Sequence, residues 1–270
     1  MNEPESPGDH RLALVTGATG AIGKAIALEI AATPGFSVVM LCRDERKADS
    51  AVREVSELTG NEHVRYEIVD LASADSIAAL AGRLQEPVHV LVNNAATTPR
   101  QRGETSDGIE LQFATNVLGY FRMTRAFGRQ LKAGAPSRVV NVASYWAGDL
   151  DLDDLEFRRR PYDNNAAYRQ SKQANRMLTV AFAGRLLEHG VAVNACHPGD
   201  VNSRLSNDLG FGGHESPMKG ARTPAWLATD PVGQCETGKY FEHMQPRRCR
   251  FAEDAAAVEA LYQACLAYEN

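Results

Sequence analysis

The sequence predicts an α/β protein with a doubly wound parallel sheet of about seven strands, in a single domain covering residues 11–270. Short apolar, β-branched segments recur along the chain, and segments with apolar residues at three- and four-residue spacing lie between them. A glycine-rich turn follows the first apolar segment. Regular alternation of this kind produces right-handed βαβ units, with helices on both faces of the sheet. Since 44% of the 270 residues are hydrophobic and 23% are charged, the chain can bury a large core.

The expected elements follow in chain order. The strands are 12–15, 37–42, 64–69, 88–92, 138–143, 191–196 and a shorter 239–241, and the helices include 21–32, 45–58, 73–84 and 167–187. The sequence TPGF at 33–36 should end the first helix, and Ser73 with Asp75 can cap the helix that follows the third strand. A last, alanine-rich helix over 253–268 is expected to cover either a subunit interface or the substrate pocket.

Composition excludes several classes of protein. A net charge of −5 gives no general attraction to nucleic acid, and the basic runs 158–160 and 247–248 are interpreted as solvated faces. No segment approaches the roughly 20 apolar residues of a membrane span, and residues 1–10 are expected to be a flexible polar tail rather than a signal peptide. Five scattered cysteines indicate reduced thiols, and the seven histidines form no ligand-like cluster. We therefore expect a cytoplasmic protein without a metal site or membrane anchor.

One long segment, about residues 200–219, has little periodicity. Its Gly, Ser and Asn residues suggest mobility, while Leu205, Leu209, Phe211 and Met218 offer apolar contacts. A loop of this length in a compact domain is usually a lid or is disordered, and we expect a lid over the substrate.

The glycine-rich turn lies in LVTGATGAIGKA, residues 14–25, with glycines at 17, 20 and 23. A buried strand, a glycine turn and a helix N-terminus form the Rossmann-type arrangement in which a pyrophosphate lies against free backbone N–H groups. This pattern predicts a dinucleotide cofactor.

The residues that follow the second expected strand suggest which dinucleotide is bound. An NAD enzyme typically has Asp or Glu at this strand end, but here Cys42 is followed by Arg43, and Lys24 is available from the glycine turn. Two cations near the adenosine ribose favour NADP(H), with NAD(H) still possible. In the alternative, Asp44 contacts the ribose and Arg43 is simply exposed. Asp70, at the end of the third strand, either accepts from the adenine amine or caps a helix.

Four residues form a candidate catalytic group. Tyr168 and Lys172 lie four residues apart and should point the same way from a helix. The lysine would lower the pKa of the tyrosine, which is otherwise a poor acid–base group at neutral pH. Ser144 follows an apolar strand and could donate to a substrate carbonyl, and Asn116 could hold the lysine directly or through a water. Taken singly, Ser144 and Asn116 are also typical of caps or satisfied polar groups.

The motifs NNAA (93–96), TNVLGYF (115–121), APSRVVNVAS (135–144), AYRQSKQAN (167–175), HPGDV (197–201) and TGKYF (237–241) resemble the short-chain dehydrogenase/reductase family. Within its single-domain branch, the chain is similar to retinol dehydrogenase and WW-domain oxidoreductase relatives. The resemblance implies an enzyme with the catalytic tetrad Asn116, Ser144, Tyr168 and Lys172, and hydride transfer at nicotinamide C4. The implied cofactor contacts are Gly17, Thr19, Gly20, Ala21, Ile22, Gly23, Lys24, Arg43, Asp70, Leu71, Asn93, Asn94, Ala95, Tyr168, Lys172, Pro198, Gly199, Val201 and Ser203.

The resemblance also has departures. Single-domain members usually have glycine at 21, whereas Gly20 gives the spacing of two-domain sugar-nucleotide epimerases. The wide gap between Ser144 and Tyr168 is similar to that of retinol dehydrogenase relatives, whose amino-terminal membrane anchor is missing here. The relation implies that Pro198–Val201 lie beside the nicotinamide and that the Ser203 hydroxyl reaches its carboxamide. Family membership also makes a homo-oligomer possible, through the helices after Asn116 and around Tyr168.

The predicted function is interconversion of a ketone or aldehyde with an alcohol, on a fairly large apolar or aromatic small-molecule substrate. The candidate pocket walls are Tyr145, Trp146, Thr97, Thr98, Leu209 and Phe211. The alternatives are a non-catalytic dinucleotide-binding regulator, a nucleotide-sugar epimerase or dehydratase, and a reductase of C=C bonds.

Overall fold

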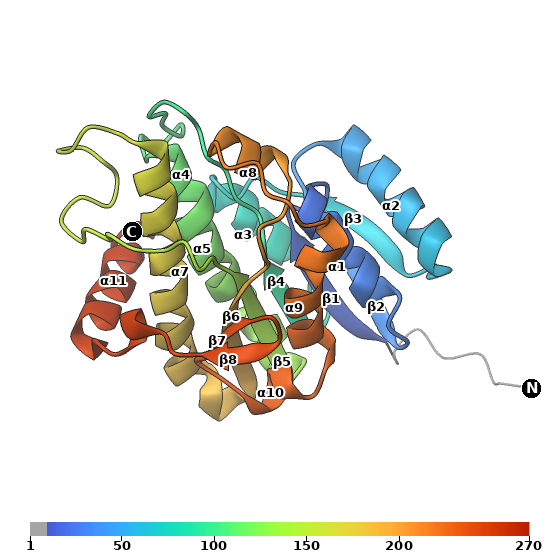
Figure 1. Cartoon of the computed structure of the whole chain (residues 1–270). Helices are drawn as coiled ribbons and strands as arrows, with labels where there is room; N and C mark the ends of the chain where they lie inside the picture. Colours follow the sequence, from blue (N-terminus) through green and yellow to red (C-terminus); the bar gives the residue numbers. More distant parts are fainter. Residues whose placement is uncertain (1–9, 270) are drawn as a thin grey trace, which may run out of the picture.

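The computed structural model describes residues 10–269, so nearly all of the expected N-terminal tail lies outside the described residues. One sheet carries eight strands in the order β3-β2-β1-β4-β5-β6-β7-β8 (Figure 1). The strands are β1 Arg11–Thr16, β2 Phe36–Cys42, β3 Val64–Ile68, β4 Val90–Asn93, β5 Ser137–Val142, β6 Val191–His197, β7 Tyr240–Glu242 and β8 Gln245–Arg247. β1 to β7 are parallel, which confirms the predicted doubly wound α/β fold.

The sheet has one short strand in addition to the about seven that were expected. β8 runs antiparallel to β7 after a tight turn in which His243 and Met244 have φ of 50° and 59°. Its three residues are exposed and include Pro246, so neither apolar alternation nor β propensity marks it in the sequence.

The helices lie between the strands as expected, with additional short ones in the second half of the chain. Their bounds are α1 Ala21–Ala31, α2 Glu45–Thr59, α3 Ala74–Arg83, α4 Leu111–Phe113, η1 Ala114–Leu118, α5 Gly119–Ala126, α6 Gly128–Ala133, α7 Asn164–Leu186, η2 Leu187–His189, α8 Arg204–Asp208, α9 Pro217–Thr229, α10 Val232–Cys235, η3 Arg250–Ala252 and α11 Ala255–Ala267. Two predicted helix boundaries are confirmed. α1 ends before Thr33-Pro34-Gly35, and the Ser73 side chain caps α3 by accepting from Ser76 N–H.

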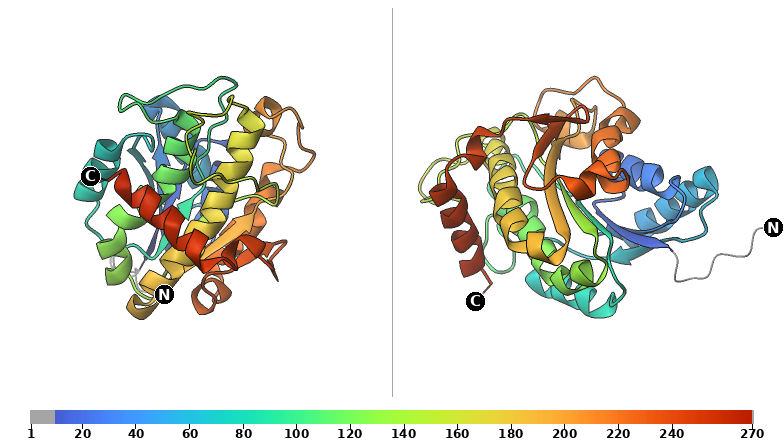
Figure 2. Two further views of the ribbon diagram at one scale, coloured as in Figure 1. Left: turned by 90° about the vertical axis from the view of Figure 1, so that its left-hand side faces the viewer. Right: turned by 90° about the horizontal axis from the view of Figure 1, so that it is seen from below.

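Helices cover both faces of the sheet (Figure 2). Leu12 and Leu14 of β1 belong to the core on the α3, α5 and α7 side, while Ala13 and Val15 belong to the core under α1 and α9. Because successive strand residues point to opposite faces, a strand buried on both sides reads as a continuous apolar run. This explains why continuous apolar segments located these strands in the sequence.

The C-terminal helix α11 packs on the outer side of α7 (Figures 1 and 2). Phe121 of α5 meets Tyr262 of α11 at 5.2 Å and Phe182 of α7 at 5.4 Å between ring centroids. Arg122 on α5 binds the Glu269 carboxylate at 2.9 Å. α11 therefore covers the surface formed by α5 and α7, and the alternatives of a subunit interface and the substrate pocket stay predictions. The expected homo-oligomer through these helices stays a prediction.

The segment between Ser144 and α7 is an ordered loop organised by buried carboxylates. Asp154 accepts the backbone N–H groups of Arg158, Arg159 and Arg160 at 2.7, 3.2 and 3.0 Å. Its pKa is lowered because these hydrogen bonds outweigh the opposing effect of burial. The interpretation of residues 158–160 as a solvated face agrees with the exposure of Arg158 and Arg159, whereas Arg160 is half-buried. Arg158 pairs with Glu156 and Arg160 with Asp154, both carboxylates of the loop.

We expect Phe121→Ala to lower the free energy of unfolding by about 3–5 kcal/mol, because the ring is fully buried between α7 and α11. Urea unfolding followed by circular dichroism measures the change. Leu58→Ala is the control, because Leu58 is 67% exposed and should cost less than about 0.5 kcal/mol. Equal effects of the two substitutions would contradict this packing.

Candidate active site

The predicted functional residues gather at the carboxyl ends of the central strands. The chain order reverses between β1 and β4, which are neighbours in the sheet although β2 and β3 lie on the other side of β1. Loops leaving β1 and β4 diverge there, and an open α/β sheet has its ligand crevice at such a point. The glycine turn follows β1, Ser144 follows β5, and residues 198–203 follow β6.

The glycine turn has the close backbone approaches that its composition predicts. Gly17 has φ +65°, and a Cβ there would lie 2.8 Å from Ala95 Cα. A Cβ on Gly23 would lie 2.3 Å from the Gly17 carbonyl oxygen. α1 begins at Ala21, and its N-cap Gly20 provides no side-chain cap, so the first N–H groups of the helix stay available. The shift of glycine from 21 to 20 thus leaves a strand, turn and helix N-terminus suited to a pyrophosphate.

Thr16 and Asn94 connect the glycine turn to the end of β4. The Thr16 hydroxyl accepts from Asn94 N–H at 2.8 Å and Ala95 N–H at 3.1 Å, and the Asn94 amide donates to the Thr16 carbonyl at 2.9 Å. Asn93 is fully buried and donates to Asn141 at 2.9 Å, so its side chain supports the strands from within. Thr16 was not among the predicted residues, although the sequence places it directly before Gly17 of the glycine turn.

Beyond β2, one of the two predicted cations has no ion pair among residues 10–269, and the other is paired. Arg43 is exposed at the strand end, above the buried Cys42. Lys24 binds Glu54 of α2 at 2.7 Å, so its charge is paired in the folded chain, and its expected place near the ribose stays a prediction. Glu54 lies on the next helix, so no sequence pattern around Lys24 indicates that the two residues pair. The Asp44 side chain caps α2 by accepting from Lys47 N–H at 3.1 Å.

The residues predicted for the adenine end follow β3. Asp70 is exposed and accepts from Ala72 N–H at 3.0 Å within its own turn, whereas the residue that caps α3 is Ser73. Leu71 is buried in the core beside α5. Thr19, in the glycine turn, donates its backbone N–H toward the Cys42 sulfur.

Ser144 and Tyr168 are brought into hydrogen-bonding contact. Tyr168 lies in α7 and Ser144 at the end of β5, and both are buried. Burial raises the pKa of Tyr168 to about 12, with the Ser144 hydrogen bond lowering it and the Asp200 charge raising it. The Ser144 hydroxyl also accepts from Trp146 N–H at 3.0 Å, which fixes its position.

Lys172 lies one turn after Tyr168 and is buried without a carboxylate partner among the described residues. Its Nζ donates to the Val142 carbonyl at 2.8 Å and lies 5.6 Å from the Tyr168 ring centroid. Burial lowers the pKa of Lys172 to about 7. The expected lowering of the Tyr168 pKa by this lysine is therefore not found, because desolvation dominates both groups. Tyr120 donates to the same carbonyl at 3.3 Å, a contact not predicted although Tyr120 lies in the motif 115–121.

Asn116 lies in a π-helical turn, η1, between α4 and α5. Its side chain accepts from Thr97 N–H at 2.8 Å and donates to the Thr97 carbonyl at 3.0 Å. The amide also approaches Ser171 of α7 at 3.3 Å. The Asn116 side chain thus holds the chain after β4 against α7 rather than contacting Lys172 directly. Single-turn π-bulges are frequent at functional sites.

These loops enclose a cavity of about 320 Å³. Ser144 and Tyr168 line it together with Ile22 of the glycine turn, Pro198–Val201 and Ser203. Of the predicted substrate contacts, Tyr145, Trp146 and Phe211 line the cavity, while Leu209, Thr97 and Thr98 do not. Leu209 is buried in the folded loop instead. Asp200 lies within the segment expected beside the nicotinamide, and Leu205 was expected as an apolar contact of the lid; both line the cavity. Lining residues that were not predicted are His197, Ser206, Gly213 and His214.

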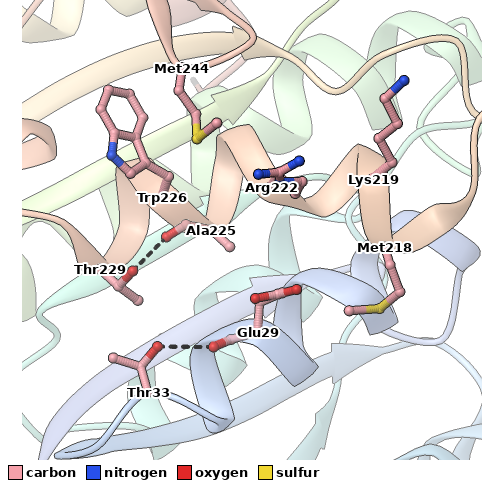
Figure 3. Close-up of a pocket in the computed structure, with 9 residues that line it drawn as sticks. All are labelled: Glu29, Thr33, Met218, Lys219, Arg222, Ala225, Trp226, Thr229 and Met244. Atoms are coloured by element: carbon pink, nitrogen blue, oxygen red, sulfur yellow. Dashed lines mark hydrogen bonds between the residues drawn. The ribbon is translucent and has the colours of Figure 1, made fainter.

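The predicted lid is an ordered loop that contains a helix. Val201 bridges to Glu215 at its base, α8 lies within it, and α9 begins at Pro217. Ser203 caps α8 by accepting from Ser206 N–H at 3.1 Å, so its hydroxyl is already engaged there. Met218, expected to offer an apolar contact in the lid, lines a separate hollow between α1 and α9 (Figure 3). That hollow is larger, about 480 Å³, but no predicted catalytic side chain lines it.

Comparisons with known proteins agree with this arrangement. A short chain dehydrogenase family model matches residues 11–210. Retinol dehydrogenase 13 of Mus musculus is 38% identical over 87% of this chain and 76% of its own length. Retinol dehydrogenase 12 of Homo sapiens is 39% identical over 72% of this chain and 63% of its own length.

Solved structures of two other proteins are also similar to this chain. An uncharacterized protein from Mycobacterium paratuberculosis superposes with a TM-score of 0.80 at 30% identity, covering 94% of this chain and 91% of that one. A single-residue variant of actinorhodin polyketide ketoreductase, solved with NADPH, has a TM-score of 0.68 at 25% identity over 88% and 97% of the two chains.

The fold and site define a dinucleotide-dependent oxidoreductase of the α/β class. The chain belongs to the short-chain dehydrogenase/reductase family, which is NAD(P)-dependent, and it is similar to the retinol dehydrogenases within it. Between residues 10 and 269, no helix combines the length and apolar character that a membrane crossing requires.

The buried Lys172 makes stability depend on pH. Its pKa is about 7 in the folded chain and near the ordinary 10.5 after unfolding, so the unfolded state binds more protons between these values. We expect the free energy of unfolding to rise with pH from 7 to 9, by up to about 1.4 kcal/mol per pH unit from this group. Lys172→Met should flatten the rise, whereas exposed Lys132→Met should keep it. Denaturant titrations at each pH measure the slope, and parallel slopes for wild type and Lys172→Met would refute the assignment.

Proposed function

We propose that this protein is an NADP(H)-dependent oxidoreductase that interconverts a ketone or aldehyde with an alcohol. The observation that carries the proposal is the cavity itself. Its wall combines the hydrogen-bonded Ser144 and Tyr168, the start of α1 through Ile22, and the loop after β6. Aromatic side chains complete it and favour a fairly large apolar or aromatic substrate.

Tyr168 is the residue that we assign to proton transfer. The raised pKa keeps its phenol protonated at neutral pH, which suits donation to an oxygen that gains negative charge. Ser144, held by Trp146 N–H, can donate to the same oxygen, so the developing charge is neutralised from two sides. In the opposite direction, Tyr168 accepts the alcohol proton.

The chain fits a dinucleotide on structural grounds. The turn has no room for a side chain at Gly17 or Gly23, and the uncapped N–H groups of α1 would bind the pyrophosphate. When bound, the nicotinamide supplies or accepts the hydride. Ile22, Pro198, Gly199, Val201 and Ser203 are the residues that would lie beside it, because they share the cavity wall with Tyr168.

Arg43 supports the choice of NADP(H). It is exposed directly after β2, where an NAD enzyme has a carboxylate, and the neighbouring Asp44 is used as a helix cap. The ketoreductase solved with NADPH shares the fold at 25% identity. With Lys24 paired to Glu54, the preference for the 2′-phosphate depends mainly on Arg43.

The first test follows the oxidation of NADPH and NADH by absorbance with a panel of bulky ketones, aldehydes and polycyclic quinones. We expect wild-type turnover, and a loss of at least about 100-fold in kcat for Tyr168→Phe with cofactor binding retained. Tyr162→Phe is the matched control, because this partly buried tyrosine lies outside the cavity. If wild type binds cofactor but no carbonyl is reduced, the non-catalytic regulator gains support.

The second test concerns cofactor choice. Arg43→Ala should reduce affinity for NADPH relative to NADH by roughly tenfold to a hundredfold, because a charge-assisted contact to phosphate is lost. Arg53→Ala, which removes an exposed arginine paired with Asp49 further along α2, should leave the ratio unchanged. Cofactor titrations measure both affinities, and an unchanged ratio for Arg43→Ala would contradict the proposed NADP preference.

A further inference from the structure

The cavity contains a charge to which the proposed reaction assigns no contact with the substrate. Among the residues that line it in the described structure, Asp200 is the one Asp, Glu, Lys or Arg. His197 is neutral at pH 7, since burial lowers its pKa to about 4. With His197 and His214 counted as neutral, the formal charge of the cavity wall is negative, and it comes from a single carboxylate.

The Asp200 carboxylate is held in place but is not neutralised. The Tyr145 hydroxyl hydrogen-bonds to it, and the Asp200 carbonyl accepts from His214 N–H at 2.8 Å and Glu215 N–H at 3.0 Å. Neighbouring acids have other partners: Glu215 binds Lys219 at 2.6 Å, and Glu242 accepts from Tyr240 at 2.8 Å. Within residues 10–269 no lysine or arginine pairs with Asp200. A partly buried carboxylate without a cation is one that a cationic ligand would stabilise.

Aromatic rings surround the same space. Trp146 meets Phe211 edge to face at 5.8 Å and 87°, and it lies 6.0 Å from the Tyr168 ring. Tyr145, 52% exposed, packs edge to face on His197 at 4.6 Å. The exposed Phe211 and Tyr145 leave ring surface available at the mouth. Aromatic faces attract organic cations through their quadrupole, and a nearby carboxylate adds to this attraction.

We propose that the substrate of this enzyme is an organic cation, a carbonyl compound or alcohol that carries a protonated or quaternary amine. The charged nitrogen would be recognised by Asp200 together with the rings of Tyr145, Trp146 and Phe211. The carbonyl would reach Ser144 and Tyr168 in the same cavity. This inference rests on the proposed function and adds the substrate class to it.

The experiment uses two ketones of equal shape and different charge, (4-acetylphenyl)trimethylammonium and 4-tert-butylacetophenone. Binding is measured first, by quenching of Trp146 fluorescence. The chain has two tryptophans, and Trp226 lines the hollow in Figure 3, so a Trp226→Phe background makes Trp146 the only reporter. We expect the cation to bind about tenfold more tightly than its neutral counterpart. The anionic 4-acetylbenzoate should bind most weakly.

NADPH consumption with the same two ketones is measured separately. Discrimination in binding without any turnover would leave the cation site intact and count against the proposed reductase. Turnover with equal or tighter binding of the neutral ketone would overturn the cation proposal and leave the reductase intact. The two proposals therefore fail on different measurements.

Asp200→Asn tests the carboxylate itself. The ratio of cation to neutral affinity should fall about tenfold, because the amide keeps the shape of the side chain and loses its charge. Asp153→Asn is the control: it removes one exposed carboxylate that does not line the cavity, and the ratio should stay at the wild-type value. An unchanged ratio in Asp200→Asn would overturn the role of Asp200 even if the wild-type enzyme prefers cations.

Discussion

The main-chain carbonyl of Val142 is the point on which the candidate site depends. It accepts from Lys172 on α7 at 2.8 Å and from Tyr120 on α5 at 3.3 Å, so one oxygen at the end of β5 fixes two helices relative to the sheet. A buried ammonium without a carboxylate partner is costly unless its hydrogens are bound. Because Tyr168 and Lys172 share a helix, this contact also sets the position of the phenol against Ser144.

A second network holds the loop between Ser144 and α7. The Glu156 carboxylate accepts from Glu110 N–H at 3.0 Å and from the Tyr268 hydroxyl at 2.8 Å, and it pairs with Arg158. It thereby ties this loop to the start of α4 and to the end of the chain. Trp146 and Tyr145 lie at the beginning of the loop, so the order of the aromatic wall depends on carboxylates outside the cavity.

Much of the fold could be predicted because its strands are buried on both faces and because its turns and helix caps depend on nearby residues. Apolar runs marked β1 to β7, and the glycines of the first turn marked a close backbone approach that the Gly17 and Gly23 geometry shows. β8 was not predicted, because its residues are exposed and show no hydrophobic pattern. Ser144, Tyr168 and Lys172 were predictable as a group, since strand ends and helical spacing determine where such side chains lie.

The sequence by itself determined the parallel α/β architecture, the glycine turn and the side chains brought together at its edge, because periodicity and turn chemistry act over a few residues. Only the tertiary structure decided that Lys24 is paired with Glu54, that Leu209 and Met218 lie away from the cavity, and that His197 and His214 line it. These outcomes depend on contacts between residues distant in the chain, and the long loop before α9 has no pattern that fixes its path. Burial likewise set the pKa values of Tyr168 and Lys172, since desolvation depends on everything packed around a group.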